Sequence, residues 1–185
     1  MKSYLITDPK IYSSNLNKFE SILNKIINNN QIDYICFRDK DSSNYEELAN
    51  SFVKISKENN IPNIFINSHI ELAYSLNATG VHLTSTQFDK IAYAKSIGLK
   101  TIISTHNEDD IKQAINNNVD YITYSPIFDT PNKGKAKGID DLKYITNKYK
   151  DIKIFALGGI VSNNHIDMIK SINSYGFASI RYFLK

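Results

Sequence analysis

Eight short apolar runs alternate with segments of helical periodicity along the chain, and this alternation constrains the fold most. The runs are rich in Ile, Val, Tyr and Phe and recur about every 20 to 30 residues. Strict alternation with short connections favours parallel strands joined by right-handed crossovers. We therefore expect eight β-strands, over residues 4–7, 34–38, 63–67, 80–83, 101–104, 121–124, 153–157 and 177–180.

The segments between these runs carry apolar residues at helical spacing. In the second such segment, Ser43 and Glu46 have the spacing of a capping box, so Ser43 is the expected N-cap. The fifth, over residues 108–117, is expected to follow a cap at Asn107 or Thr105. Its apolar face would bury Ile111, Ala114 and Ile115.

Eight alternating strands favour a closed (β/α)8 TIM barrel over an open doubly wound sheet, because no GxGxxG follows the first strand. The 185 residues suit one domain, residues 1–185, but are few for such a barrel. Only five residues, RYFLK, follow the eighth strand, so the last outer helix should be largely missing. The apolar groove left behind is expected to be covered by homodimerisation or by docking of Tyr182, Phe183 and Leu184.

Composition argues against several classes of partner. The formal net charge of +3 comes from 22 basic and 19 acidic residues that are scattered, so no nucleic-acid tract is predicted. The opening MKSYLITDPK is too short an apolar run for a signal peptide, and no stretch has the ~18 apolar residues of a membrane span. We therefore expect no nucleic-acid or membrane partner and a cytoplasmic location.

A single cysteine, Cys36, excludes an internal disulfide and a multi-cysteine metal site. It lies in the strand-like run DYICFR, where it is either a buried small hydrophobe or a thiol that lines a pocket. The first interpretation is favoured, because free cysteine is among the most buried residue types.

Cationic and polar residues follow the second to fifth strands, at the end where such barrels place their chemistry. Arg38 and Lys40, two residues apart on a strand, would point to one side and converge on an anion, unless this is simply a solvated strand end. After the third strand, Asn67 is a candidate ligand-binding residue, and His69 is expected at a helix cap or the surface. His82 is expected to be a hydrogen-bonded core residue.

The fifth to eighth strands end in groups suited to an anion. Ser104 and His106 follow the fifth strand, and His106 is the histidine most expected to be functional. The loop SPIFDTPNKGKAKG carries three lysines, at positions 133, 135 and 137, and is predicted to be a lid or phosphate-binding loop, or else a solvated basic loop. Gly158, Gly159 and Arg181 then stand where barrels of this type often bind phosphate.

Taken together, these motifs resemble the thiamine phosphate synthase and TenI family of (β/α)8 barrels, which belongs to thiamine biosynthesis. The matching pieces, in order along nearly the whole chain, are YLITD, FRDK, IN..IELA, GVHL, S.H, SPIFDT...K and ALGGI. Each piece is short, but their order and spacing on successive strand ends make the combined pattern specific.

The resemblance implies a pyrophosphate side that is only partly retained. The family's Q-x-R-x-K pattern grips the pyrophosphate of the pyrimidine substrate; here it keeps Arg38 and Lys40 but has Cys36 for glutamine. The two aspartates that would hold Mg²⁺ read Ser68 and Gln87, which are poor anchors for a hard dication. No metal site and no required cofactor are therefore expected, with Mg²⁺ needed only if the chain is a synthase.

The implied thiazole-phosphate side is better retained. Thr130, Lys133 and the glycine pair match the family, whereas Asn132 replaces a usual threonine. Arg181 replaces a small serine and would either bind the phosphate or block its site. TenI-type relatives that tautomerise thiazole phosphate use a histidine just after the sixth strand. This chain has Ser125 there, so His106 is the alternative base if it faces the same cavity.

Three hypotheses follow. The first is a TenI-like protein that binds a thiazole phosphate or related phosphorylated heterocycle, with tautomerase-type isomerase activity; the others are a thiamine phosphate synthase that releases pyrophosphate and a catalytically silent binding or regulatory protein. The expected catalytic residues are Lys133, His106 and Lys40. The expected ligand-binding residues are Arg38, Lys40, Asn67, Ser104, Thr130, Lys133, Gly158, Gly159 and Arg181.

Overall fold

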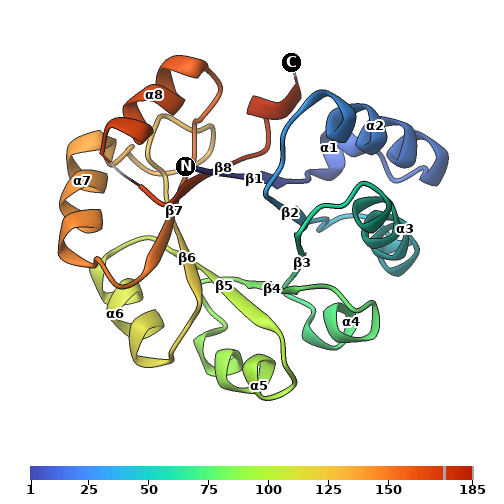
Figure 1. Cartoon of the computed structure of the whole chain (residues 1–185), viewed down its shortest axis with the longest axis horizontal. Coiled ribbons are helices and arrows are strands. Elements are labelled where there is room, and N and C mark those ends of the chain that lie inside the picture. Colours follow the sequence, from blue (N-terminus) through green and yellow to red (C-terminus); the bar gives the residue numbers. More distant parts are fainter. Residues whose placement is uncertain (173, 185) are drawn as a thin grey trace.

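The computed structural model describes residues 1–172 and 174–184, and its eight parallel strands close into a barrel in chain order (Figure 1). The last strand pairs with the first, with Tyr4 opposite Ala178. The predicted (β/α)8 barrel is thereby confirmed. Its strands are β1 (Lys2–Ile6), β2 (Tyr34–Phe37), β3 (Asn63–Asn67), β4 (Gly80–Leu83), β5 (Lys100–Thr105), β6 (Tyr121–Tyr124), β7 (Lys153–Leu157) and β8 (Gly176–Ser179).

Helices surround the strands as an outer ring (Figure 1). They are α1 (Pro9–Tyr12), α2 (Leu16–Asn29), α3 (Tyr45–Glu58), α4 (Ile70–Ser75), α5 (Ile91–Ser96), α6 (Glu108–Asn116), α7 (Gly138–Lys148) and α8 (Asn163–Ser171). A short 3₁₀ turn, η1 (Phe88–Lys90), leads into α5. Within the described residues, none of these helices is long and apolar enough to span a bilayer.

The ring lacks an α-helix after β8 in the described part of the chain, as predicted. Its place is taken by the 3₁₀ turn η2 (Tyr182–Leu184). Phe183 is buried and stacks on Phe177 with ring centroids 5.8 Å apart, and the Asn30 side chain donates to the Phe183 carbonyl. The Tyr182 ring also packs on Phe177, with centroids 5.2 Å apart, so docking is confirmed for Tyr182 and Phe183. It is wrong for Leu184, which is 40% exposed because the turn ends there. Homodimerisation stays a prediction.

Several local expectations need correction. The second strand ends at Phe37, so Arg38 and Lys40 lie beyond it and strand alternation does not orient them. The cap of α3 is Asn44 rather than Ser43, because the helix begins one residue later than the capping-box spacing implied. The predicted cap of α6 at Asn107 is confirmed, but Ile115 is 40% exposed. It follows the buried Ala114 by about 100° of helical rotation, which turns it away from the barrel.

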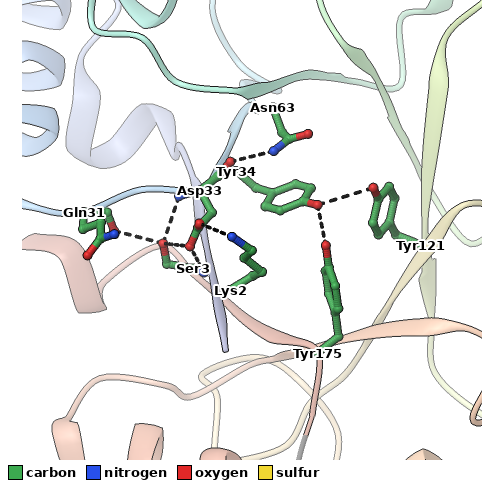
Figure 2. A network of polar contacts seen from close by, with 8 residues as sticks. All are labelled: Lys2, Ser3, Gln31, Asp33, Tyr34, Asn63, Tyr121 and Tyr175. Carbon is green, nitrogen blue, oxygen red and sulfur yellow. Dashed lines mark hydrogen bonds and ion pairs between the residues drawn. The ribbon is translucent and has the colours of Figure 1, made fainter.

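Aromatic rings fill the barrel interior toward the amino-terminal ends of the strands. Tyr4, Phe65 and Phe155 are fully buried there, and Gly80 makes room for the Phe65 ring, because a β-carbon on it would lie 2.6 Å from that ring. At the amino-terminal end of the strands, the hydroxyl groups of three tyrosines converge (Figure 2). Tyr34 is 2.6 Å from the hydroxyl of Tyr175 and donates to that of Tyr121 at 3.4 Å. These side chains lie at the end of the barrel opposite the carboxyl ends of the strands.

His82 lies inside the barrel and is 4% exposed. Its Nδ1 atom is 2.8 Å from the Tyr4 hydroxyl, and its Nε2 atom is 3.2 Å from Ser104 Oγ. The predicted hydrogen-bonded core histidine is therefore confirmed. Burial, followed by the nearby positive charge of Arg38, lowers the pKa of His82 to about 3.

This neutral imidazole should make the folded state less stable as the pH falls. The unfolded chain protonates His82 with an ordinary pKa of about 6.5, whereas the folded chain does so only at about 3. Stability is therefore highest above the first value and is lost as the pH falls toward the second. Between about pH 7 and pH 4.5, this group should cost about 2 kcal/mol of unfolding free energy.

Urea unfolding at the two pH values checks this prediction. A His82→Gln variant should lose about 2 kcal/mol less than the wild type over that interval. A His69→Gln control, at an exposed position before α4, should keep the wild-type pH dependence. An unchanged pH dependence in His82→Gln would contradict the prediction.

Candidate active site

A cavity of about 630 Å³ lies at the carboxyl ends of the strands. All eight strand ends contribute to it, which is the expected location of chemistry in this fold. Its lining consists of Ile6, Asp8, Lys10, Ile11, Arg38, Lys40, Asn67, His82, Thr84, Ser85, Ser104, His106, Ser125, Pro126, Thr130, Pro131, Lys133, Leu157, Gly158, Gly159, Ile160, Ser179, Ile180 and Arg181.

The cavity brings together every ligand-binding and catalytic residue that the sequence predicted. Their roles stay predictions, but their convergence on one cavity is a property of the structure. The lining also includes Asp8 and Lys10, which sequence reasoning missed because the end of the first strand was not considered. The signal was present in the run ITDPK, where polar residues follow an apolar strand.

Arg38 and Lys40 reach the cavity through a turn rather than through strand alternation. Between them, the buried Asp39 accepts hydrogen bonds from the backbone N–H groups of Asp41 and Ser42. This turns the Asp39 carboxylate into the protein while both neighbouring cations line the cavity. Asp8 lies 3.8 Å from the Arg38 guanidinium, so the cationic side is partly balanced by one carboxylate.

The loop after β6 is held against the end of β7. The backbone N–H of Phe128 donates to the Gly158 carbonyl, and Thr130 Oγ1 donates to the Phe128 carbonyl. Of the three loop lysines, only Lys133 lines the cavity. Lys137 lies over the Tyr124 ring at 4.9 Å, and the exposed Lys135 lies outside the lining. Of the three lysines in the predicted phosphate-binding loop, only Lys133 is therefore placed to reach a ligand in the cavity.

The backbone just after β7 requires glycine at two successive positions. Gly158 and Gly159 have φ values of +99° and +68°, which residues with a side chain rarely adopt. A β-carbon on Gly158 would lie 2.8 Å from Pro126 Cα, and one on Gly159 would lie 2.6 Å from the Phe128 carbonyl carbon. Among the described residues, neither glycine N–H has a hydrogen-bond acceptor, so both remain available to a ligand.

Arg181 is exposed and lines the same part of the cavity as the glycine pair. The sequence left open whether this arginine binds a phosphate or fills its site. The Arg181 side chain stands on the wall of a cavity of about 630 Å³. Arginine is the residue type best suited to bind a phosphate, and this role for Arg181 stays a prediction.

The positions where the family pattern would hold Mg²⁺ do not fit that ion. The Gln87 side-chain oxygen already accepts from the Thr84 N–H at 3.0 Å, and the Gln87 amide donates to the Ser68 carbonyl. Asp89 is 70% exposed at its side chain and pairs with Lys90. Across residues 1–172 and 174–184, no three His, Cys, Asp or Glu side chains are grouped as metal ligands. Mg²⁺ prefers several oxygen ligands including carboxylates, which these side chains do not supply.

His106 stands at the cavity mouth beside Ser125. Its Nδ1 atom is 3.2 Å from both the carbonyl oxygen and the hydroxyl of Ser125. A proton on Nδ1 would be donated to one of these oxygens, and Nε2 would then carry the lone pair that a base needs. The contacts orient the exposed ring beside Ser125.

Cys36 does not belong to the site. It is fully buried inside the barrel, and burial raises the pKa of its thiol to about 12. The interpretation of this residue as a small buried hydrophobe is confirmed.

Comparison with known proteins identifies the family of the chain. The chain matches the family described as thiamine monophosphate synthase over residues 3–182. It is 32% identical over 189 residues to the putative thiamine-phosphate synthase 2 of Aquifex aeolicus (strain VF5), which covers 98% of this chain and 97% of that protein. It is 30% identical over 176 residues to the thiamine-phosphate synthase of Clostridium acetobutylicum, covering 92% of this chain and 81% of that protein.

A solved structure supports the fold. The thiamine phosphate pyrophosphorylase of Pyrococcus furiosus superimposes with a TM-score of 0.80 at 20% identity, over 97% of this chain and 85% of that one. At this identity the likeness concerns the barrel alone. The family match over nearly the whole chain carries the assignment: this protein belongs to the thiamine monophosphate synthase family, which includes the TenI-type proteins.

Proposed function

We propose that the protein binds a thiazole phosphate or a related phosphorylated heterocycle and acts on it as a TenI-like, thiazole tautomerase-type isomerase. One observation carries this proposal: the His106 ring lies against Ser125, the position at which TenI-type relatives have their catalytic histidine. A histidine from β5 would thereby replace one that is missing after β6.

The phosphate group would bind between β7 and β8. Gly158, Gly159, Arg181 and Lys133 all line the cavity, and the two glycine N–H groups have no acceptor among the described residues. Backbone N–H groups and arginine are the donors that most often bind phosphate oxygens. Thr130 also lines the cavity, and the bond from its hydroxyl to the Phe128 carbonyl holds it there, so we expect it to contact the phosphate.

The isomerisation moves one proton within the bound heterocycle. His106 Nε2 takes a proton from one ring atom and returns a proton to another, while the electron pair released at the first atom shifts through the ring. No oxidant or reductant is needed, because the two tautomers have the same composition. The bond from Nδ1–H to the Ser125 carbonyl keeps the ring oriented for this exchange.

Thiamine phosphate synthase is the second candidate, favoured by the names of the relatives and by the cations that follow β1 and β2 on the cavity wall. Lys10, Arg38 and Lys40 would stabilise a pyrophosphate leaving group as its bond to the pyrimidine methylene carbon breaks and the thiazole nitrogen bonds to that carbon. Lys40 would then be catalytic. This candidate stands second because Mg²⁺ normally neutralises such a leaving group, and Ser68 and Gln87 are not suited to bind that ion.

The phosphate site can be tested with two lysines of one loop. Lys133→Ala should weaken thiazole phosphate binding about tenfold, because it removes a charge-assisted hydrogen bond at a solvent-accessible site. Lys135→Ala removes the same charge two residues away, outside the cavity lining, and should change the dissociation constant less than about twofold. Isothermal titration calorimetry measures both. Equal effects of the two substitutions would mean that only net charge matters.

The proposed base can be tested by proton exchange. His106→Gln should slow tautomerisation, followed by NMR in D₂O, at least about 100-fold, while the dissociation constant changes less than about threefold. His69→Gln should leave both quantities unchanged, since that exposed ring lies against Tyr45 outside the cavity lining. Full exchange activity in His106→Gln would contradict the assignment.

The same protein distinguishes the other candidates. Incubation with both phosphorylated halves and Mg²⁺ should yield no thiamine phosphate. Product formation that disappears in Lys40→Ala would instead favour the synthase. Tight binding of thiazole phosphate with neither activity would favour the silent binding protein.

A further inference from the structure

A chain of hydrogen bonds leads from the cavity into the core of the barrel. Ser104 is half-buried on the cavity wall, its hydroxyl is 3.2 Å from His82 Nε2, and His82 Nδ1 is 2.8 Å from the Tyr4 hydroxyl. The three residues come from β5, β4 and β1, and burial increases along the chain until Tyr4 is fully buried. Neither Tyr4 nor His82 has a role in the proposed phosphate site or in proton transfer by His106.

The surroundings keep His82 neutral. The Arg38 guanidinium, which lies just beyond β2, opposes a positive charge on the ring. Both Tyr4 and the nearby Cys36 thiol are uncharged, because burial raises the pKa of each. Among the described residues, no carboxylate forms an ion pair with His82. A charged imidazole would thus be desolvated without a counter-ion.

Neutrality links the two hydrogen bonds of the ring. A neutral imidazole has one N–H and one lone pair, so if one nitrogen accepts, the other donates. When the Tyr4 hydroxyl donates to Nδ1, Nε2–H donates to Ser104 Oγ, and the serine hydroxyl hydrogen is free to point at a ligand. The opposite tautomer would use that hydrogen inside the protein. The short contact from a phenol, which is a strong donor, favours the first arrangement.

We propose that Tyr4 and His82 are positioning residues that hold the Ser104 hydroxyl as a hydrogen-bond donor toward a neutral acceptor atom, such as an unprotonated ring nitrogen, of the bound heterocycle. This inference rests on the proposed function for the identity of the ligand. The two cavity histidines then have different tasks. The exposed His106 moves protons, and the buried His82 determines that the Ser104 hydroxyl donates its hydrogen bond to the ligand. Ligands that present a donor at this point are disfavoured, because two donors would face each other.

NMR of protein labelled with ¹⁵N at histidine tests the hydrogen-bond chain without any ligand. Wild-type His82 should show one neutral tautomer, with the proton on Nε2, at every pH from about 5 to 8. Tyr4→Phe removes only the hydroxyl and should leave a mixture of tautomers, with circular dichroism confirming that the variant folds. A wild-type proton on Nδ1, or a ring that becomes charged in this interval, would overturn the inference.

Binding measurements test the consequence for the ligand. Tyr4→Phe and Ser104→Ala should each weaken thiazole phosphate binding about tenfold, and the double variant should bind about as weakly as either single one, since both break one chain. Binding of inorganic phosphate, which has no heterocycle, should change less than about twofold. Unchanged thiazole phosphate binding in Tyr4→Phe would refute the inference.

The two experiments separate this inference from the proposed function. If the wild type binds inorganic phosphate but not thiazole phosphate, the proposed function fails, and the NMR tautomer alone decides whether Tyr4 and His82 position Ser104. If thiazole phosphate binds and only the Tyr4→Phe and Ser104→Ala effects are missing, the function stands and the inference fails.

Discussion

The pairing of β8 with β1 is the constraint on which the site depends. Four register pairs, from Lys2 opposite Gly176 to Leu5 opposite Ser179, close the parallel sheet. Closure places Asp8 and Lys10, after the first strand, in the same cavity as Arg181, after the last. Because the outer helix after β8 is replaced by η2, the packing of Phe183 on Phe177 covers the closing strand from outside. The short barrel thereby keeps all eight strand ends at one rim.

The cavity wall divides into parts with different chemistry. Its cationic side follows β1 and β2, whereas its glycine-lined side follows β7 and β8 and adds Arg181. The wall after β3 and β4 is neutral: Asn67, Thr84 and Ser85 line the cavity there, and the Asn67 amide donates to the His82 carbonyl. A single phosphate needs only one of the two basic regions. A divalent metal needs carboxylates, which the neutral wall lacks. For this reason we propose isomerisation of a phosphorylated heterocycle rather than displacement of pyrophosphate.

Much of this arrangement was predictable from the sequence, because parallel strands bring their carboxyl ends to one rim. Ser104, His106 and the glycine pair could each be assigned to that rim once their strands were recognised. Arg38 and Lys40 were placed there for the wrong reason, since a turn held by Asp39 orients them. The link between Tyr4 and His82 joins residues 78 positions apart, and no local pattern reveals such a contact.

The central claim is that a phosphorylated heterocycle binds with its phosphate on the glycine side of the cavity. A crystal structure of the protein with thiazole phosphate tests this most directly. Phosphate oxygens should lie within hydrogen-bond distance of the Gly158 and Gly159 N–H groups and of the Arg181 guanidinium. A phosphate bound instead to Arg38 and Lys40, with the glycine N–H groups facing solvent, would contradict it.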